Sequence, residues 1–152
     1  MAKVIDIPDD VLRAFNAFAA THPVTDTTPK PKYLIVRMTD DFLSCAIDSI
    51  ATLGSTYTDM VSQLSPTHCR WIIYSLDVDD DIQVPERTLC FMAWSPDDAP
   101  VKQKMLYSAS KGFFRRGLPG GIDMFLVQAA SPDEIALNVV VERVIEKQSP
   151  QQ

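Results

Sequence analysis

The chain of 152 residues contains no long hydrophobic run. Its apolar stretches fall well short of the roughly 18 residues that a membrane-spanning helix needs, so we do not expect a membrane-spanning protein. The opening residues, MAKVIDIPDD, also lack the charged start, apolar run and small-residue cleavage site of a secretory signal. The sequence therefore predicts a cytoplasmic protein.

Cysteine is scarce, and its three copies form no recognisable motif. Cys45, Cys69 and Cys90 are widely spaced and include no CxxC pair. Disulfide frameworks and most zinc sites need paired cysteines. We therefore expect free, buried thiols in a reducing compartment rather than a disulfide or a metal site.

The side chains of catalytic and metal sites are also missing. His22 and His68 are the only histidines, and neither has a second ligand at metal-binding spacing. The aspartate cluster at 77–81 lacks the glycine and the distal glutamate of an EF-hand loop, so we expect a solvated hairpin tip there. No nucleophile elbow, phosphate-binding glycine loop or dinucleotide fingerprint occurs. We expect no metal, no cofactor and no enzymatic activity.

Net positive charge is absent, because 14 Lys and Arg face 20 Asp and Glu, giving a net charge of −6. Such a protein is poorly suited to nucleic acid, since phosphate binding needs positive charge. Residues 101–116 depart from this average, because they carry five basic side chains and no acidic one. The five are Lys102, Lys104, Lys111, Arg115 and Arg116. This concentration of charge calls for a local explanation.

What the chain does contain fits one globular domain, with a hydrophobic content of 46%. We expect that domain over residues 1–148 and a short flexible tail at 149–152. Periodicity, turn residues and capping signals predict helices at 9–21, 56–64, 101–118 and 132–147, an exposed loop at 21–32, and strands at 33–38, 42–50, 69–76, 88–94 and 125–128. The first two strands form a hairpin, and 69–76 is a central strand. The predicted class is α/β (α+β), with a mixed sheet flanked by helices.

The basic segment 101–118 forms a two-sided helix when it is placed on a wheel of about 100° per residue. The side expected to pack on the sheet collects Leu106, Tyr107, Ser110, Phe113 and Phe114. The other side and its flanks collect Val101, Lys102, Lys104, Met105, Ser108, Gly112, Arg115 and Arg116. Apolar anchors ringed by positive charge are typical of protein-binding surfaces, which predicts an acidic partner. The alternative is a helix wound slightly differently, with Met105 half buried and the lysines only solvating.

Residues 94–111, WSPDDAPVKQKMLYSASK, resemble the signature of the long actin-binding helix in the actin-depolymerising factor (ADF)/cofilin family. Residues 11–16 resemble the family's first helix, and residues 57–74 resemble a further segment, with Tyr57, Cys69 and Arg70 among the matches. The similarity covers nearly the whole chain and follows the family's order. It implies the ADF-homology (gelsolin-like) fold, which has a central mixed sheet of five to six strands, helices on both faces and no catalytic centre.

The resemblance also implies an actin-binding surface. In the family the long helix enters the cleft between two actin subdomains, assisted by the N-terminal arm. Lys102 and Lys104 match two basic positions that pair with acidic residues of actin, and Met105 matches an apolar contact. The monomer-binding surface so implied comprises Lys3, Val4, Ile5, Val101, Lys102, Lys104, Met105, Ser108 and Arg115. Because actin is acidic, local positive charge would steer and orient binding despite the negative total.

A monomeric protein of the actin cytoskeleton that captures ADP-actin and speeds filament turnover is the function this resemblance implies. Family members also meet phosphoinositide headgroups, which would compete for Lys102 and Lys104. One alternative is a debranching relative that binds the actin-related branching complex instead of actin. An undetected small enzyme is disfavoured by the missing nucleophile and metal constellations.

The sequence departs from the family at its second, filament-binding surface. That surface uses a basic hairpin loop and a charged stripe on the last helix, whereas loop 79–87 here is acidic, with Arg87 its only cation. On the last helix, an acidic stripe is expected from Glu134, Asn138, Glu142 and Glu146. The candidate filament-surface residues are Glu86, Arg87, Glu134, Asn138 and Glu142. We predict weak filament side-binding and weak severing, because a negative stripe repels an acidic filament. The alternative is that the alignment slips and Arg143 or Lys147 serves instead.

The N-terminal arm departs from the family as well. Family members often carry a phosphorylatable serine near the start, and Lys3 stands at that place here. The off-switch in which a phosphate repels the acidic residues of actin is then absent, and a lysine would favour binding. The alternative is a disordered and unimportant arm.

Overall fold

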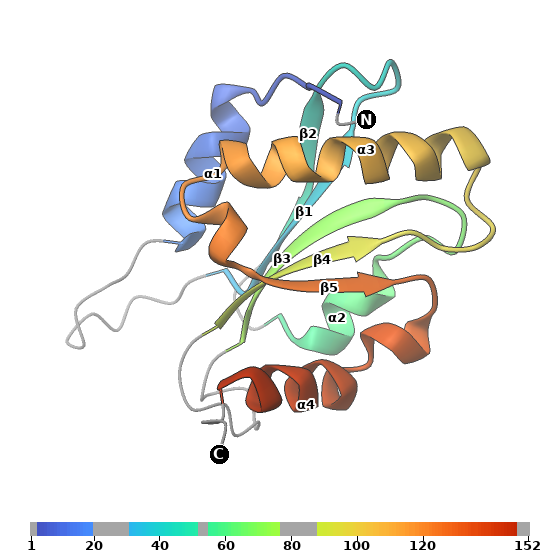
Figure 1. The fold of residues 1–152 in the computed structure, drawn as a ribbon. Coiled ribbons are helices and arrows are strands. Elements are labelled where there is room, and N and C mark those ends of the chain that lie inside the picture. Colours follow the sequence, from blue (N-terminus) through green and yellow to red (C-terminus); the bar gives the residue numbers. More distant parts are fainter. Residues whose placement is uncertain (1–2, 20–30, 52–54, 77–87, 149–152) are drawn as a thin grey trace.

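The computed structural model describes residues 3–19, 31–51, 55–76 and 88–148. It contains four α-helices, two 3-10 helices and five strands in these segments (Figure 1). In chain order they are α1 (Asp9–Ala19), β1 (Tyr33–Met38), β2 (Cys45–Ile50), α2 (Tyr57–Ser62), β3 (Arg70–Leu76), β4 (Thr88–Trp94), α3 (Val101–Gly117), η1 (Gly121–Asp123), β5 (Phe125–Ala129), η2 (Pro132–Ile135) and α4 (Leu137–Gln148). The predictions for the aspartate cluster at 77–81, Glu86, Arg87 and the tail at 149–152, and most of that for the loop at 21–32, lie outside the described residues.

The five strands form one mixed sheet in the order β2-β1-β3-β4-β5. All neighbouring pairs are antiparallel except β4 and β5, which are parallel and are connected through α3. Parallel neighbours need a crossover connection, and α3 supplies it. The predicted fold class, with a mixed sheet and a central β3, is confirmed.

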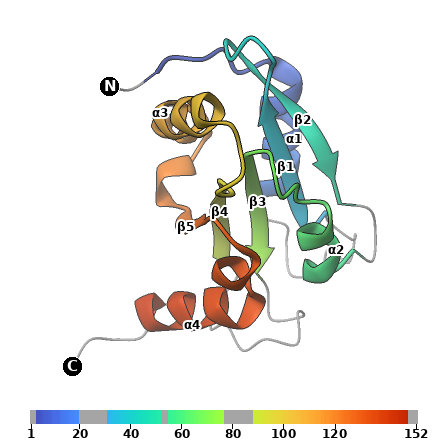
Figure 2. The same cartoon turned by 90° about the vertical axis from the view of Figure 1, so that its right-hand side faces the viewer.

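Helices cover both faces of the sheet, and each face has its own hydrophobic core (Figure 2). α1 and α3 pack on one face through residues such as Phe15 and Phe114, against Trp71 and Phe91 of the strands. α2 and α4 pack on the other face, over a second cluster of buried side chains. α2 is short, and a capping box holds its start: Asp59 N donates to Thr56 Oγ1 at 3.2 Å, and Thr56 N donates to Asp59 Oδ2 at 2.8 Å.

The second strand starts at Cys45, three residues later than the predicted Phe42, because a tight turn precedes it. Phe42 has φ of 59°, a left-handed conformation that bulky residues rarely adopt. Thr39 holds the turn, since its amide donates to Ser44 O at 2.9 Å and its carbonyl accepts from Phe42 N at 2.9 Å. Asp41 adds a carboxylate that accepts from Leu43 N at 3.0 Å. The hairpin itself is confirmed.

The last helix was predicted as one continuous helix over 132–147, and this prediction is wrong. The chain forms η2, passes through an extended Ala136, and only then starts α4. Both Ile135 and Val144 are buried in the same core cluster. In one continuous helix these positions, nine residues apart, would point to opposite sides. The break lets both side chains reach the core, and the Tyr57 hydroxyl donates to the carbonyl of Ile135.

The acidic stripe changes with this break. Glu134 lies in η2, where its Oε1 accepts from Ala130 N at 3.0 Å, so it does not continue the face of Asn138 and Glu142. On α4 the exposed acidic residues Glu142 and Glu146 alternate with exposed Arg143 and Lys147. The exposed face of α4 is therefore mixed in charge, and the predicted four-residue acidic stripe is corrected.

The three cysteines are free and buried, as predicted. Burial raises the pKa of the Cys45 and Cys90 thiols to about 12. Because the thiolate is the reactive form, these side chains act as small core residues in the folded protein.

Candidate functional site: the exposed face of α3

One face of α3 is fixed to the sheet by aromatic packing. The Phe114 ring stacks on Trp71, with centroids 4.7 Å apart and planes 19° apart. The Tyr107 ring lies 5.1 Å from Trp71, and its hydroxyl accepts from Met38 N at 2.8 Å. Tyr107, Ser110 and Phe114 are all buried, as predicted for the inner side of the helix, whereas Leu106 and Phe113 of the same predicted side are only partly buried.

The opposite face of α3 presents apolar side chains to solvent. Met105 is 65% exposed, and Val101, one turn before it, is 69% exposed. Lys102 and Ser108 are exposed beside them, and Lys104 is partly exposed. The alternative in which Met105 is half buried does not hold. Large apolar side chains among cations on a rigid helix are a protein-contact arrangement.

Two of the lysines are held in position by contacts within the chain. Lys104 Nζ donates to the carbonyl of Asp97 at 3.1 Å. The ammonium of Lys102 lies 5.8 Å from the centre of the Phe42 ring, a cation–π distance. The turn that precedes β2 therefore lies next to the first turn of α3. Neither contact neutralises the charge of the lysine.

The N-terminal arm runs against α3. Lys3 N donates to Ala109 O at 2.8 Å, and Asp6 N donates to Leu43 O at 2.8 Å. Between these bonds, Val4 is 70% exposed, which places it at the surface. Ile5 was grouped with the contact surface, but its side chain is only 3% exposed and packs in the core. It anchors the arm instead of facing a partner.

Arg115 was also placed on the contact surface, and its guanidinium turns towards its own chain. Nη2 donates to Ile122 O at 3.3 Å and to Met124 O at 3.1 Å. The guanidinium carbon lies 5.5 Å from the centre of the Phe91 ring. These contacts tie the end of α3 to η1, so much of the Arg115 side chain is engaged before any partner arrives.

The turn before β2 is a neighbour of α3 that was not predicted from the sequence. Leu43 is 61% exposed there, and Phe42 lies under the ammonium of Lys102. The run Thr39-Asp40-Asp41 is a turn signal that could have placed the start of the strand later. The contact with Lys102 could not have been found, because it joins segments about sixty residues apart in sequence.

Of the candidate filament-surface residues that the structure describes, Asn138 and Glu142 lie apart from α3, whereas Glu134 of η2 lines a pocket together with residues of α3. Asn138 and Glu142 are exposed on α4, which covers the other face of the sheet (Figure 2). Within the described residues no cluster of three or more His, Cys, Asp or Glu side chains could hold a metal ion. None of the described helices is both long and apolar enough to cross a membrane.

Comparison with known proteins adds to this geometry. Residues 4–145 match the family model of the cofilin/tropomyosin-type actin-binding proteins. A cofilin of Mycosarcoma maydis is 30% identical over 115 residues, which cover 76% of this chain and 81% of that protein. Actin-depolymerizing factor 3 of Arabidopsis thaliana is 34% identical over 112 residues, covering 74% and 79%. The crystal structure of a Streptomyces griseoflavus cofilin superposes with a TM-score of 0.76 at 23% identity, covering 94% of this chain and 98% of that one.

Proposed function

Because the chain belongs to the cofilin/tropomyosin-type family of actin-binding proteins, we propose that it binds actin monomers through the exposed face of α3. The ADP-bound monomer is the preferred form, and capture of that form promotes filament depolymerisation and turnover in the cytoplasm. The two lysines Lys102 and Lys104 orient an acidic partner by charge. The curated relatives carry the names cofilin and actin-depolymerizing factor, so the comparisons do not favour the branching-complex alternative.

The observation that carries this proposal is the exposed Met105 on a helix whose other face is locked to the sheet. An exposed methionine costs free energy in water, and covering it with a partner recovers that cost. Val101 extends the apolar patch by one turn, and Val4 of the arm supplies a further exposed apolar side chain. Lys3 adds positive charge where the arm meets α3, in place of a phosphorylatable serine.

Filament side-binding and severing are proposed to be weak. Support comes from the sequence of loop 79–87, which has a single cation, and from α4, whose exposed charges balance. A balanced face provides little attraction to an acidic filament. Filament binding is therefore expected to be weak because attraction is missing, and not because a continuous acidic stripe repels the filament.

Titration of fluorescently labelled actin monomers tests the proposal directly. We expect saturable binding to both nucleotide forms, with a lower Kd for ADP-actin than for ATP-actin. Co-sedimentation with filaments should pellet less than one chain per actin subunit at near-saturating protein. Absence of monomer binding would contradict the function, and stoichiometric pelleting with rapid filament cutting would contradict the weak second surface.

Phosphoinositide headgroups are proposed as competitors for the same cations. The double variant Lys102→Ala with Lys104→Ala should float with phosphoinositide-containing liposomes to a much smaller extent than the unmodified chain, since each cation near an anionic surface adds about 1 kcal/mol. Arg143→Ala, which removes one cation from α4, is the control and should float like the unmodified chain. Equal flotation of all three proteins would remove the lipid from the proposal.

A further inference from the structure

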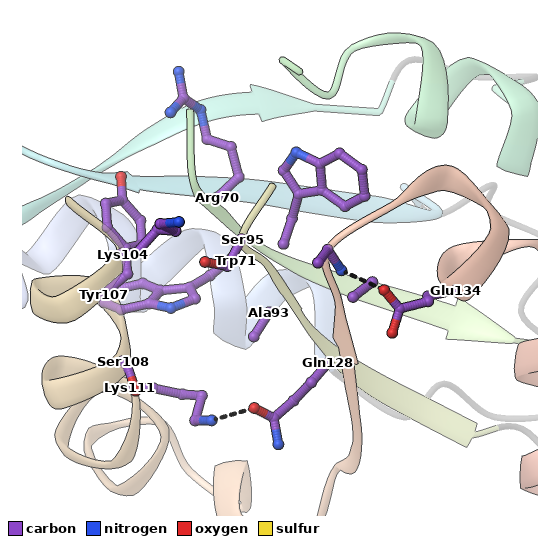
Figure 3. Close-up of a pocket in the computed structure, with 13 residues that line it drawn as sticks. Arg70, Trp71, Ala93, Ser95, Lys104, Tyr107, Ser108, Lys111, Gln128 and Glu134 are labelled. Atoms are coloured by element: carbon purple, nitrogen blue, oxygen red, sulfur yellow. Dashed lines mark hydrogen bonds between the residues drawn. The ribbon is translucent and has the colours of Figure 1, made fainter. Parts of the chain in front are cut away.

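A pocket of about 260 Å³ lies between α3 and the ends of β4 and β5 (Figure 3). Lys104, Ser108 and Lys111 line it from α3, and Gln128 and Glu134 line it from β5 and η2. Positions 104, 108 and 111 recur at helical spacing, so their side chains share one face of α3. The two lysines are two turns apart, about 10 Å along the helix axis.

The two lysines of the pocket carry positive charge that no described carboxylate neutralises. Lys104 Nζ donates to the backbone carbonyl of Asp97 at 3.1 Å, and Lys111 Nζ donates to the amide oxygen Oε1 of Gln128 at 3.1 Å. Both acceptors are neutral. The ion pairs of the described residues are formed by Asp48, whose Oδ2 lies 3.3 Å from Nε of Arg70. The charge of Arg70 is thereby neutralised by a carboxylate, whereas the charges of Lys104 and Lys111 are not.

Lys111 is held in a place that disfavours its own charge. Burial is the main cause, with the nearby charge of Arg115 as the second, and both lower the pKa of this amine from its ordinary value. An anion beside the amine would offset both effects, because an opposite charge favours the protonated form. The geometry and the charge thus point to the same kind of ligand.

The remaining lining is suited to the body of an organic molecule. Ala93 and Ala129 contribute methyl groups, and Ser95 and Ser108 contribute hydroxyls. Both tryptophans of the chain, Trp71 and Trp94, also line the pocket. On the η2 side, Glu134 Oε1 already accepts from Ala130 N at 3.0 Å, which holds that carboxylate against the chain segment after β5 (Figure 3).

We propose that this pocket binds a compact organic dianion, with one acidic group on Lys104, the other on Lys111, and an apolar linker over Ala93. A short dicarboxylate has this chemistry. Its two charges replace the neutral oxygen partners of the lysines with charge-assisted hydrogen bonds, which are shorter and stronger.

A titration with sodium glutarate at constant ionic strength tests the site in a solution that contains no actin. The two indole N–H signals in a ¹⁵N–¹H NMR spectrum report on the pocket, since both tryptophans line it. We expect saturable shifts of these signals and of the backbone amides of Ser108, Lys111 and Gln128. The uncharged diamide glutaramide, which has the same length, should cause none of these shifts.

Two variants with the same net charge test whether Lys111 contacts the ligand. Lys111→Gln should weaken glutarate binding about tenfold, as expected for the loss of one charged hydrogen bond. Arg143→Gln removes one cation from α4, on the other face of the sheet, and should bind like the unmodified chain. Unchanged NMR signals away from the pocket verify that Lys111→Gln is folded. Shifts that fail to saturate, or equal weakening by both variants, would overturn the proposal.

Occupation of the pocket also has a consequence for actin, which rests on the proposed function. Lys104 and Ser108 belong both to the pocket and to the proposed actin-binding surface. Glutarate should therefore raise the apparent Kd for actin monomers in the unmodified chain and do so less in Lys111→Gln. Failure of the actin proposal leaves the NMR titration to decide the site by itself.

Discussion

Replacing Phe114 by alanine is expected to lower the free energy of unfolding by about 3–5 kcal/mol, the range measured for large aromatic truncations in cores. Phe114 is fully buried, stacks on Trp71 at 4.7 Å and lies 6.0 Å from the Phe91 ring. Truncation would leave a cavity between α3 and the centre of the sheet. A typical domain has only about 5–15 kcal/mol of stability in total, so the loss is large.

The neighbouring Phe113 provides the control for this prediction. It is only partly buried but packs against the same core cluster, and it has the same side-chain chemistry. Phe113→Ala should therefore lose less stability than Phe114→Ala. Urea unfolding followed by far-UV circular dichroism measures both, and circular dichroism is preferred because Trp71 fluorescence changes with the stacking itself. Equal losses would mean that Phe114 does not fix α3 to the sheet.

The elements that could be predicted from the sequence are those whose pattern follows directly from burial. β1 and β3 are nearly continuous apolar runs, because helices cover both of their faces. α3 was recognised from its two-sided pattern, and the structure buries Tyr107, Ser110 and Phe114 while exposing Met105. In these cases the local pattern of apolar residues indicates which side of the element faces the core.

The features that were not predicted depend on contacts between distant segments. The break at Ala136 arises because Ile135 and Val144 must both reach one core, and the Tyr57 hydroxyl holds the Ile135 carbonyl. Arg115 was assigned to the outer side by its helical position, yet the carbonyls that follow α3 draw its guanidinium back. A helical wheel predicts only the direction of the Cβ atom, and the end of a long flexible side chain can turn away from that direction.

The candidate site also has a part that could be predicted from the sequence and a part that could not. Its helix face could be predicted, since spacing alone puts Val101 and Met105 on one side of α3. The parts supplied by other segments could not, and these include Ile5, which is buried, and Phe42, which contacts Lys102. The pocket lined by Lys104 and Lys111 could likewise not be predicted from the sequence, because Gln128 and Glu134 of distant segments form its other wall.

Reversal of the charge at Lys104 is expected to have the largest effect on function. Lys104→Glu should weaken actin-monomer binding by about 2 kcal/mol or more, roughly a thirtyfold rise in Kd, if the lysine meets an acidic group in a desolvated contact. The hydrogen bond to the Asp97 carbonyl keeps the ammonium at the start of α3, so the lysine is already oriented before binding. A preordered charge loses less conformational entropy on binding than a free one.

Two matched variants separate the charge from its position. Lys104→Gln removes the charge without reversing it, and should weaken binding less than Lys104→Glu because no repulsion is introduced. Arg143→Glu makes the same reversal on α4, on the opposite face of the sheet, and should leave the Kd for monomers unchanged. Titration of labelled ADP-actin monomers measures all three. If Lys104→Glu and Arg143→Glu weakened binding equally, the effect would come from net charge, and the face of α3 would lose its assigned role.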